Sequence, residues 1–343
     1  MPGLKTAQRG GSEVIQLWQA DVDDFVQDLA WSSDHRFLAA ISISGSLAVF
    51  ASDGSEYWKP TPHSHAGSSV AWRPGTSEFS SIGHDGVVRH WDAHKKALIW
   101  EAESGALWGT RVAWRPNGSM LASAAGRILR LWNPEGVVQR ESADHESTIT
   151  DLGWNPDGSS VAVSAYFGVT LHILGKSTRK FQWKGSSLVL SWSPTSRFLV
   201  TGEQDSSVHV WYVKTGNDSQ MSGFATKVRE LAWHHTGNFL ATGGSDSIVL
   251  WDCSGKGPEG KTPRILEAHA SRITQLAFQF SGDQLASSDT DGIVMLWKPL
   301  SDVSPYFFHG LNSEISRLVW TSNDQRLTAG ESCGKITTFG FRK

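Results

Sequence analysis

The sequence is poor in features that mark secreted, membrane and nucleic-acid-binding proteins. Its two cysteines, Cys253 and Cys333, predict neither a disulfide framework nor a CxxC metal site, and so favour a reducing compartment. No run reaches 18 apolar residues, and residues 1–11 lack the apolar core of a secretory signal. The formal net charge is −3 without a basic run, which argues against a nucleic-acid partner. We expect a cytoplasmic protein that binds neither membrane nor nucleic acid.

Two further patterns are missing. No stretch keeps a 3.6-residue apolar period, so we expect almost no helix. No glycine-rich run joins a strand to a helix, so a phosphate-binding loop is not indicated and we expect no cofactor.

Tryptophan and glycine are abundant instead, with 17 and 34 residues. Eight aromatic residues, each ending a Leu-Ala-Trp-like tripeptide, follow one another at intervals of 38 to 45 residues: Trp31, Trp72, Trp114, Trp154, Trp192, Trp233, Phe278 and Trp320. A second tryptophan follows its anchor by 18 or 19 residues in five units: Trp91, Trp132, Trp211, Trp251 and Trp297. So large a side chain at so constant an offset indicates a repeated structural position.

Each repeat predicts short β-strands joined by tight turns. Apolar and polar residues alternate in segments such as 228–235, and "RPNG" at 115–118 and "NPDG" at 155–158 supply turns. Three strands fit within a repeat and a fourth fits between repeats, as at 97–102 and 179–184.

Four strands at this period resemble the WD-repeat β-propeller family, and Trp91-Asp92 and Trp251-Asp252 carry the Trp-Asp pair itself. The resemblance implies an all-β, closed propeller of four-stranded antiparallel blades. We predict eight blades, with seven as the alternative, because eight outer strands are found if residues 13–19 pair into the last blade and close the ring. Residues 12–343 would then form a single domain after a flexible tail over residues 1–11.

The resemblance also implies a buried polar set in some blades, made of a histidine, a hydroxyl, an aspartate and the tryptophan of the third strand. Two repeats have complete sets by this register: His63, Ser81, Asp85 and Trp91, and His269, Ser287, Asp291 and Trp297. Buried polar groups need partners, and these donors and acceptors can satisfy one another. We interpret both sets as structural hydrogen-bond networks.

A catalytic or metal-binding role is the alternative interpretation of these polar residues. Ser81, Asp85 and a histidine contain the groups of a catalytic triad, but these residue types recur wherever the repeat requires them, so we predict no catalytic residue and no enzyme. His63, His65 and His84 could also bring three imidazoles together for zinc or copper, a metal-handling alternative to the main interpretation.

The other histidines predict no site. His234 and His235 are adjacent and should point to opposite faces of a strand. His172, on a third strand, should lie on a blade surface.

The variable loops are where a partner would bind, because the scaffold itself repeats. The face that we call the top face is formed by the loops entering first strands and the turns between second and third strands. Its candidate contact residues are Phe25, His84, Trp108, Tyr166, Gln204, Lys227 and Arg272, with Phe167 as a further aromatic. Exposed aromatic and arginine residues are typical of interface hot spots. The alternative is that Phe25 and Trp108 pack inward. We therefore predict a non-catalytic, monomeric scaffold that binds a protein or peptide.

Overall fold

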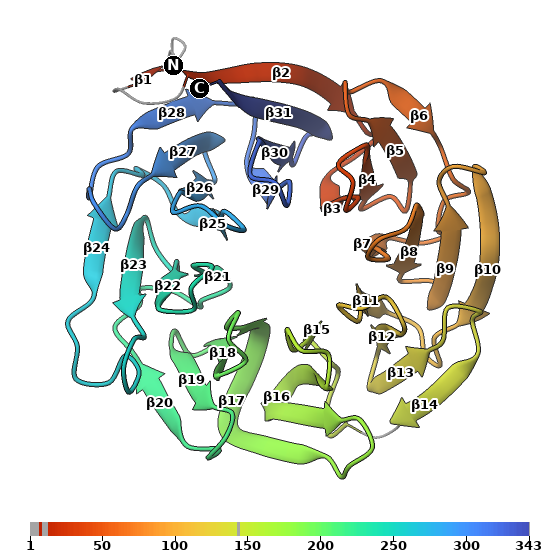
Figure 1. The fold of residues 1–343 in the computed structure, drawn as a ribbon, viewed down its shortest axis with the longest axis horizontal. Helices are drawn as coiled ribbons and strands as arrows, with labels where there is room; N and C mark the ends of the chain where they lie inside the picture. Colours follow the sequence, from red (N-terminus) through yellow and green to blue (C-terminus); the bar gives the residue numbers. More distant parts are fainter. Residues whose placement is uncertain (1–6, 9–12, 143–144, 343) are drawn as a thin grey trace. The chain divides into compact units, whose positions relative to one another are not determined.

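The computed structural model describes residues 7–8, 13–142 and 145–342, and every regular element in them is a β-strand (Figure 1). No helix among these residues has the length and apolar character needed to cross a membrane. The chain divides into two compact units, residues 22–192 and residues 1–21 with 193–343. The single domain expected for residues 12–343 stays a prediction.

Residues 22–192 contain four successive repeats of antiparallel strands, which Figure 1 shows in red to green. The first two repeats consist of β3 (Val26–Trp31), β4 (Phe37–Ser42), β5 (Leu47–Ala51) and β6 (Glu56–Trp58), then β7 (Gly67–Trp72), β8 (Glu78–Gly83), β9 (Val87–Asp92) and β10 (Ala97–Glu103). The next two consist of β11 (Gly109–Trp114), β12 (Leu121–Ala125), β13 (Ile128–Trp132) and β14 (Val138–Ser142), then β15 (Asp151–Trp154), β16 (Ser160–Ile173) and β17 (Arg179–Trp192).

The second unit continues the same pattern toward the C-terminus. Its strands begin with β18 (Phe198–Glu203), β19 (Val208–Tyr212) and β20 (Asp218–Met221), followed by β21 (Leu231–Trp233), β22 (Phe239–Thr242), β23 (Ser247–Asp252) and β24 (Arg264–Glu267). They end with β25 (Ile273–Phe278), β26 (Leu285–Asp289), β27 (Ile293–Trp297), β28 (Phe307–Gly310), β29 (Ile315–Trp320), β30 (Arg326–Glu331) and β31 (Lys335–Arg342).

The N-terminal strand β2 (Glu13–Asp21) joins the last repeat. It pairs antiparallel with β31, from Glu13 opposite Arg342 to Asp21 opposite Lys335, and the two strands lie side by side in Figure 1. The predicted pairing of residues 13–19 with the last set is therefore present. Of the tail predicted over residues 1–11, only β1 (Ala7–Gln8) is described, and it pairs with β28. The rest of that prediction lies outside the described residues.

The prediction of eight blades is wrong, because the described strands form seven hydrogen-bonded sheets. The difference arises in residues 160–192. There β16 covers both the second and the third strand expected for the fourth repeat, and β17 covers the outer strand of that repeat together with the first strand of the fifth. The fourth and fifth sequence repeats are therefore not separate four-stranded blades.

The recurrent tryptophans occupy two positions in the fold. Four anchor tryptophans donate their indole N–H to a backbone carbonyl of the preceding repeat: Trp72 to Ala30 (2.8 Å), Trp154 to Ala113 (3.0 Å), Trp192 to Gly153 (3.0 Å) and Trp320 to Ala277 (3.0 Å). Five third-strand tryptophans donate to a hydroxyl on the second strand: Trp91 to Ser81, Trp132 to Ser123, Trp211 to Thr201, Trp251 to Thr242 and Trp297 to Ser287. Each of these nine rings adds apolar packing while its polar N–H is satisfied.

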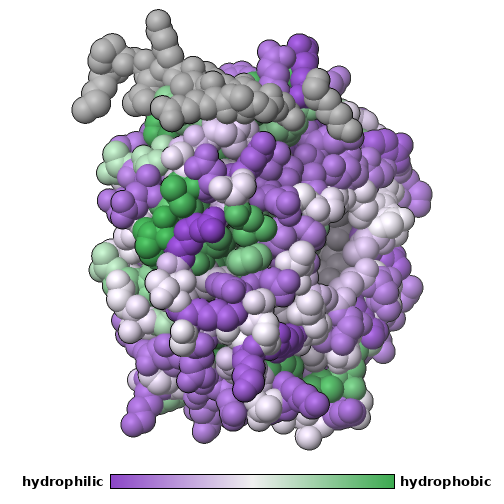
Figure 2. Space-filling model, turned by 60° about the vertical axis from the view of Figure 1, so that its left-hand side comes forward, coloured by the Kyte–Doolittle hydropathy of each residue, from purple (hydrophilic) through white to green (hydrophobic). Residues whose placement is uncertain are grey.

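The surface seen in Figure 2 is mainly hydrophilic, with hydrophobic side chains in a patch at the left of the view and in a smaller group at the lower right. Large apolar residues elsewhere are mostly buried between successive sheets, as in the cluster around Ile41, Phe79 and Trp91. The exposed aromatic residues Trp108, Tyr166 and Phe167 are therefore exceptions to the general pattern of burial, and they identify the candidate site.

Candidate partner-binding site

The second repeat brings its predicted polar set together. His63 Nδ1 lies 2.9 Å from Asp85 Oδ1, and His63 Nε2 lies 2.9 Å from Ser81 Oγ. Trp91 donates its indole N–H to the same hydroxyl at 3.1 Å. The chain of bonds connects the segment before β7 with the second and third strands of the repeat, β8 and β9, and with the turn between them.

The electrostatics of this set fit a neutral imidazole beside a carboxylate. Burial lowers the pKa of His63, and the hydrogen bond with Asp85 offsets this only in part. Burial raises the pKa of Asp85, but the hydrogen bonds that its carboxylate accepts from His63, the Val87 N–H and Arg89 outweigh it and hold that pKa well below its ordinary value. The arrangement has the connectivity of a catalytic triad. Ser81 is nevertheless fully buried and its oxygen already accepts from Trp91, so it has no access to a substrate.

The seventh repeat has the same network with one different member. His269 contacts Asp289 Oδ2 and Ser287 Oγ at 2.7 Å each, and Trp297 donates to Ser287 at 2.8 Å. The prediction of Asp291 in this set is wrong. Asp291 is exposed and accepts from Ser271 instead. Asp289 is the last residue of β26, at the position that Gly83 occupies in β8. Because a carboxylate is present at this position, it contacts His269 in place of Asp291.

The three-histidine metal site is not assembled. Both ring nitrogens of His63 are engaged within the buried set, which leaves no lone pair for a metal. His65 contacts Ser64, and the ring of His84 lies 4.9 Å from that of Trp108. Among the described residues, the histidines close enough to share a metal ion with an acidic group are His234 and His235, with Asp283.

The predicted contact residues are divided between the two units. Phe25, His84, Trp108 and Tyr166 belong to residues 22–192, whereas Gln204, Lys227 and Arg272 belong to the other unit. The latter three are exposed, and Arg272 lies 3.6 Å from Glu314. Phe25 is half-buried, while 64% of Trp108 and 46% of Tyr166 are exposed. The inward packing considered for Trp108 is therefore not observed.

The exposed aromatic residues stand on constrained backbone. Trp108 has φ +65° and Phe167 has φ +74°, in the left-handed region that bulky residues seldom adopt. Such a conformation costs roughly 1–2 kcal/mol for an L-residue. The rings of Tyr166 and Phe167 contact each other with centroids 4.1 Å apart, and His84 packs on Trp108. We call His84, Trp108, Tyr166 and Phe167 the aromatic loop surface.

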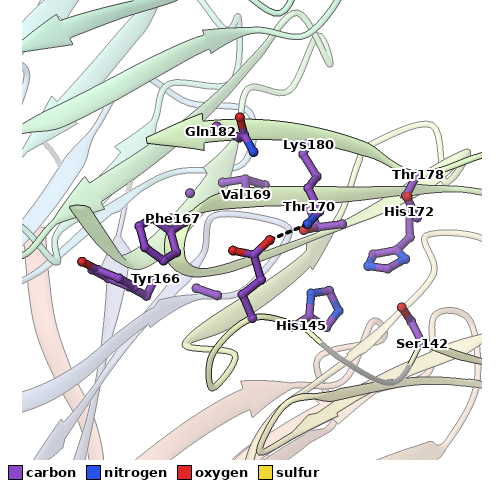
Figure 3. A pocket seen from close by; sticks show the side chains of 13 residues that line it. Ser142, His145, Tyr166, Phe167, Val169, Thr170, His172, Thr178, Lys180 and Gln182 are labelled. Carbon is purple, nitrogen blue, oxygen red and sulfur yellow. Dashed lines mark hydrogen bonds and ion pairs between the residues drawn. The ribbon is translucent and has the colours of Figure 1, made fainter. Parts of the chain in front are cut away.

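A pocket of about 190 Å³ lies beside Tyr166 and Phe167, between β16, β17 and the loop after β14 (Figure 3). Its rim is charged, because Lys180 and Glu146 form an ion pair at 2.7 Å. A second hollow shares Glu146, Phe167 and Gln182 with it. The pocket therefore combines apolar rings, a paired charge and amide groups next to one another.

The inner wall of this pocket has unsatisfied polar groups. Among the described residues, His145 Nε2 and both ring nitrogens of His172 have no hydrogen-bond partner. The two rings lie next to each other in Figure 3, with centroids 5.1 Å apart. His172 is 1% exposed, so its expected place on a blade surface is wrong. Burial, assisted by the charges of His145 and Arg140, lowers the pKa of His172 to about 3.

Sequence reasoning missed the pocket, although one signal was present. The fourth repeat has Tyr166-Phe167-Gly168 where the second repeat has the Asp85-Gly86 turn. Loss of a regular turn together with two consecutive aromatic residues indicates a locally different surface.

The comparisons with known proteins agree with the repeat pattern. Four segments match the family "WD domain, G-beta repeat": residues 104–133, 175–212, 218–252 and 260–298. The intraflagellar transport protein 80 homolog of Mus musculus is 24% identical over 169 residues, which are 48% of this chain and 21% of that protein. Autophagy-related protein 16 of Arabidopsis thaliana is 23% identical over 242 residues, 61% of this chain and 45% of that protein.

A longer match is the WD repeat-containing protein 26 homolog of Arabidopsis thaliana, with 20% identity over 317 residues, 76% of this chain and 54% of that protein. The chain thus corresponds to only part of the length of each of these relatives. The crystal structure of the computationally designed Ika8 protein superposes with a TM-score of 0.80 and 21% identity, over 96% of this chain and 100% of that one. At this identity the likeness concerns the fold alone.

Proposed function

Starting from the fact that the chain is a WD-repeat protein, we propose that it is a non-catalytic scaffold that binds a protein or peptide through the aromatic loop surface. Family members of this fold position loops on a repeated framework, and function depends on what those loops present. The near-balanced charge of the chain supports a protein partner over a nucleic acid. The two free cysteines support the cytoplasmic location expected from the sequence.

One observation carries the proposal: Trp108 is 64% exposed on a backbone of positive φ. Exposing an indole and holding a bulky residue in that region both reduce stability, so neither is explained by folding. The same combination recurs at Phe167, which is 46% exposed. The loop before β11 and an irregular stretch of β16 therefore both present strained, solvent-facing aromatic rings, and tryptophan and tyrosine are enriched in interface hot spots.

The pocket beside Tyr166 supports a peptide as the bound element. Glu146 and Lys180 are exposed at its rim and can pair with charged groups of a partner. The aromatic rings would supply apolar contact, while the pocket would fix the orientation of the partner.

Affinity capture with quantitative mass spectrometry tests the proposal. We expect a partner captured by the wild type to be reduced more than about tenfold with Trp108→Ala/Tyr166→Ala, since hot-spot losses reach about 2 kcal/mol or more. Phe280→Ala is the matched control, because Phe280 is 61% exposed and lies in the other unit. A partner that the double variant retains undiminished contradicts the choice of surface.

A further inference from the structure

His234, His235 and Asp283 come together at two turns of neighbouring repeats in the second unit. The histidines follow β21 directly, and Asp283 precedes β26. Because the histidines lie beyond the end of the strand, the alternation that would point them to opposite faces no longer applies. The expectation that they point to opposite faces is therefore wrong, because both rings approach Asp283.

The distances between their polar atoms suit a metal ion. His234 Nε2 lies 2.9 Å and His235 Nε2 lies 3.4 Å from Asp283 Oδ1, and one ligand atom from each residue lies within 4.8 Å of the others. Ligands about 2.1 Å from a tetrahedral zinc ion are separated by about 3.4 Å. Small side-chain adjustments, without backbone movement, would bring the three atoms to this spacing.

The protein already orients one ligand. The ring of His234 is buried and packs edge-on against Phe239 and Phe278, with centroids 5.9 and 5.3 Å away. Its Nδ1 lies 2.8 Å from Thr236 Oγ1. The Thr236 backbone N–H also donates to Nδ1 at 3.4 Å, and Nε2 faces the Asp283 carboxylate. These contacts of Nδ1 fix the ring with Nε2 directed at the cluster, and a metal would replace the proton on Nε2; outer-shell contacts of this kind are usual around ligating histidines.

The other side of the cluster is open to solvent. The side chain of Asp283 is 69% exposed and that of His235 is 30% exposed. Water can therefore occupy the remaining coordination position. Among the described residues, the ion pairs of Asp283 are with these two histidines and with no lysine or arginine, so no fixed cation competes for its carboxylate.

We propose that His234, His235 and Asp283 form a binding site for a divalent transition metal of the zinc class. Two imidazoles and one carboxylate suit zinc and its neighbours, whereas magnesium and calcium prefer sites made of oxygen. In the bound state both rings coordinate through Nε2 and carry their proton on Nδ1, and His234 donates that proton to Thr236. The site lies outside the aromatic loop surface and does not depend on the proposed partner.

Calorimetric titration of zinc into tag-free, chelator-treated protein tests the site. We expect one equivalent to bind to the wild type and to His65→Ala, the matched control for an exposed histidine. His235→Ala and Asp283→Asn should weaken binding more than tenfold. Thr236→Val should weaken it about tenfold, the scale of an outer-shell loss. Circular dichroism establishes that each variant is folded.

Cobalt substitution provides a second readout that needs no variant. The wild type should give the intense visible absorption of four-coordinate cobalt, and zinc should abolish it. Weak absorption typical of six-coordinate cobalt, or equal zinc affinity of the wild type and the His235→Ala and Asp283→Asn variants, would mean adventitious binding at other surface histidines and would overturn the proposal.

Discussion

At the scale of single residues, His172 shows most clearly how burial changes chemistry. Its imidazole is almost fully buried and has no partner among the described residues, so its protonated form is strongly disfavoured. The ring is neutral in the folded protein at any physiological pH. An unpaired buried polar group reduces stability, and it faces the pocket beside the aromatic loop surface.

Replacing His172 should therefore change the acid sensitivity of the protein. The folded-state pKa of about 3 lies below the ordinary value of 6.5, so below pH 6.5 the unfolded chain binds a proton that the folded chain does not. This linkage lowers the free energy of unfolding of the wild type by about 2 kcal/mol between pH 7 and pH 5. His172→Leu should lose this contribution and be at least as stable at pH 7. Urea denaturation of the wild type and the variant at pH 7 and pH 5 measures this difference. If His172→Leu had the same pH dependence of stability as the wild type, the assignment of His172 as buried and neutral would be contradicted.

At the scale of elements, Gly168 allows β16 to pass Tyr166 and Phe167 without a regular turn. It has φ +107°, next to a register shift in the pairing with β17. A Cβ at this position would lie 2.1 Å from the carbonyl oxygen of Phe181, too close for any side chain. The sequence shows the missing Asp-Gly turn, but not that the ladder continues across it. That depends on pairing with β17, which periodicity does not reveal.

Gly168→Ala should consequently destabilise the protein by about 3 kcal/mol or more, through both the unfavourable φ and the clash with backbone. Gly175→Ala is the matched control, since Gly175 also has positive φ but a Cβ there would meet no atom within 4 Å. The control should cost only about 1 kcal/mol. Thermal unfolding compares the two; equal losses would show that the close approach to β17 is not present.

At the scale of the whole molecule, the repeated tryptophans made the all-β, WD-repeat character predictable. Their spacing gave the strand order, and the pairing of β2 with β31 also followed from it. The number of sheets could not be predicted from this spacing, because β17 contains strands of two successive sequence repeats. Asp289 took the place of Asp291 because strand-end geometry decides which carboxylate reaches His269. The pocket depends on the pairing of β16 with β17, and the His234 cluster depends on turns from two repeats, so no local sequence pattern encodes either.

At the scale of the whole molecule, our central proposal is that a partner binds at the aromatic loop surface. Hydrogen–deuterium exchange of the protein, alone and with a purified partner, tests it most directly, because bound loops exchange more slowly. We expect the partner to slow exchange in the segments around Trp108 and around Tyr166–Phe167, with little change at Phe280. Protection confined to other segments, with both aromatic loops exchanging as in the free protein, would contradict it.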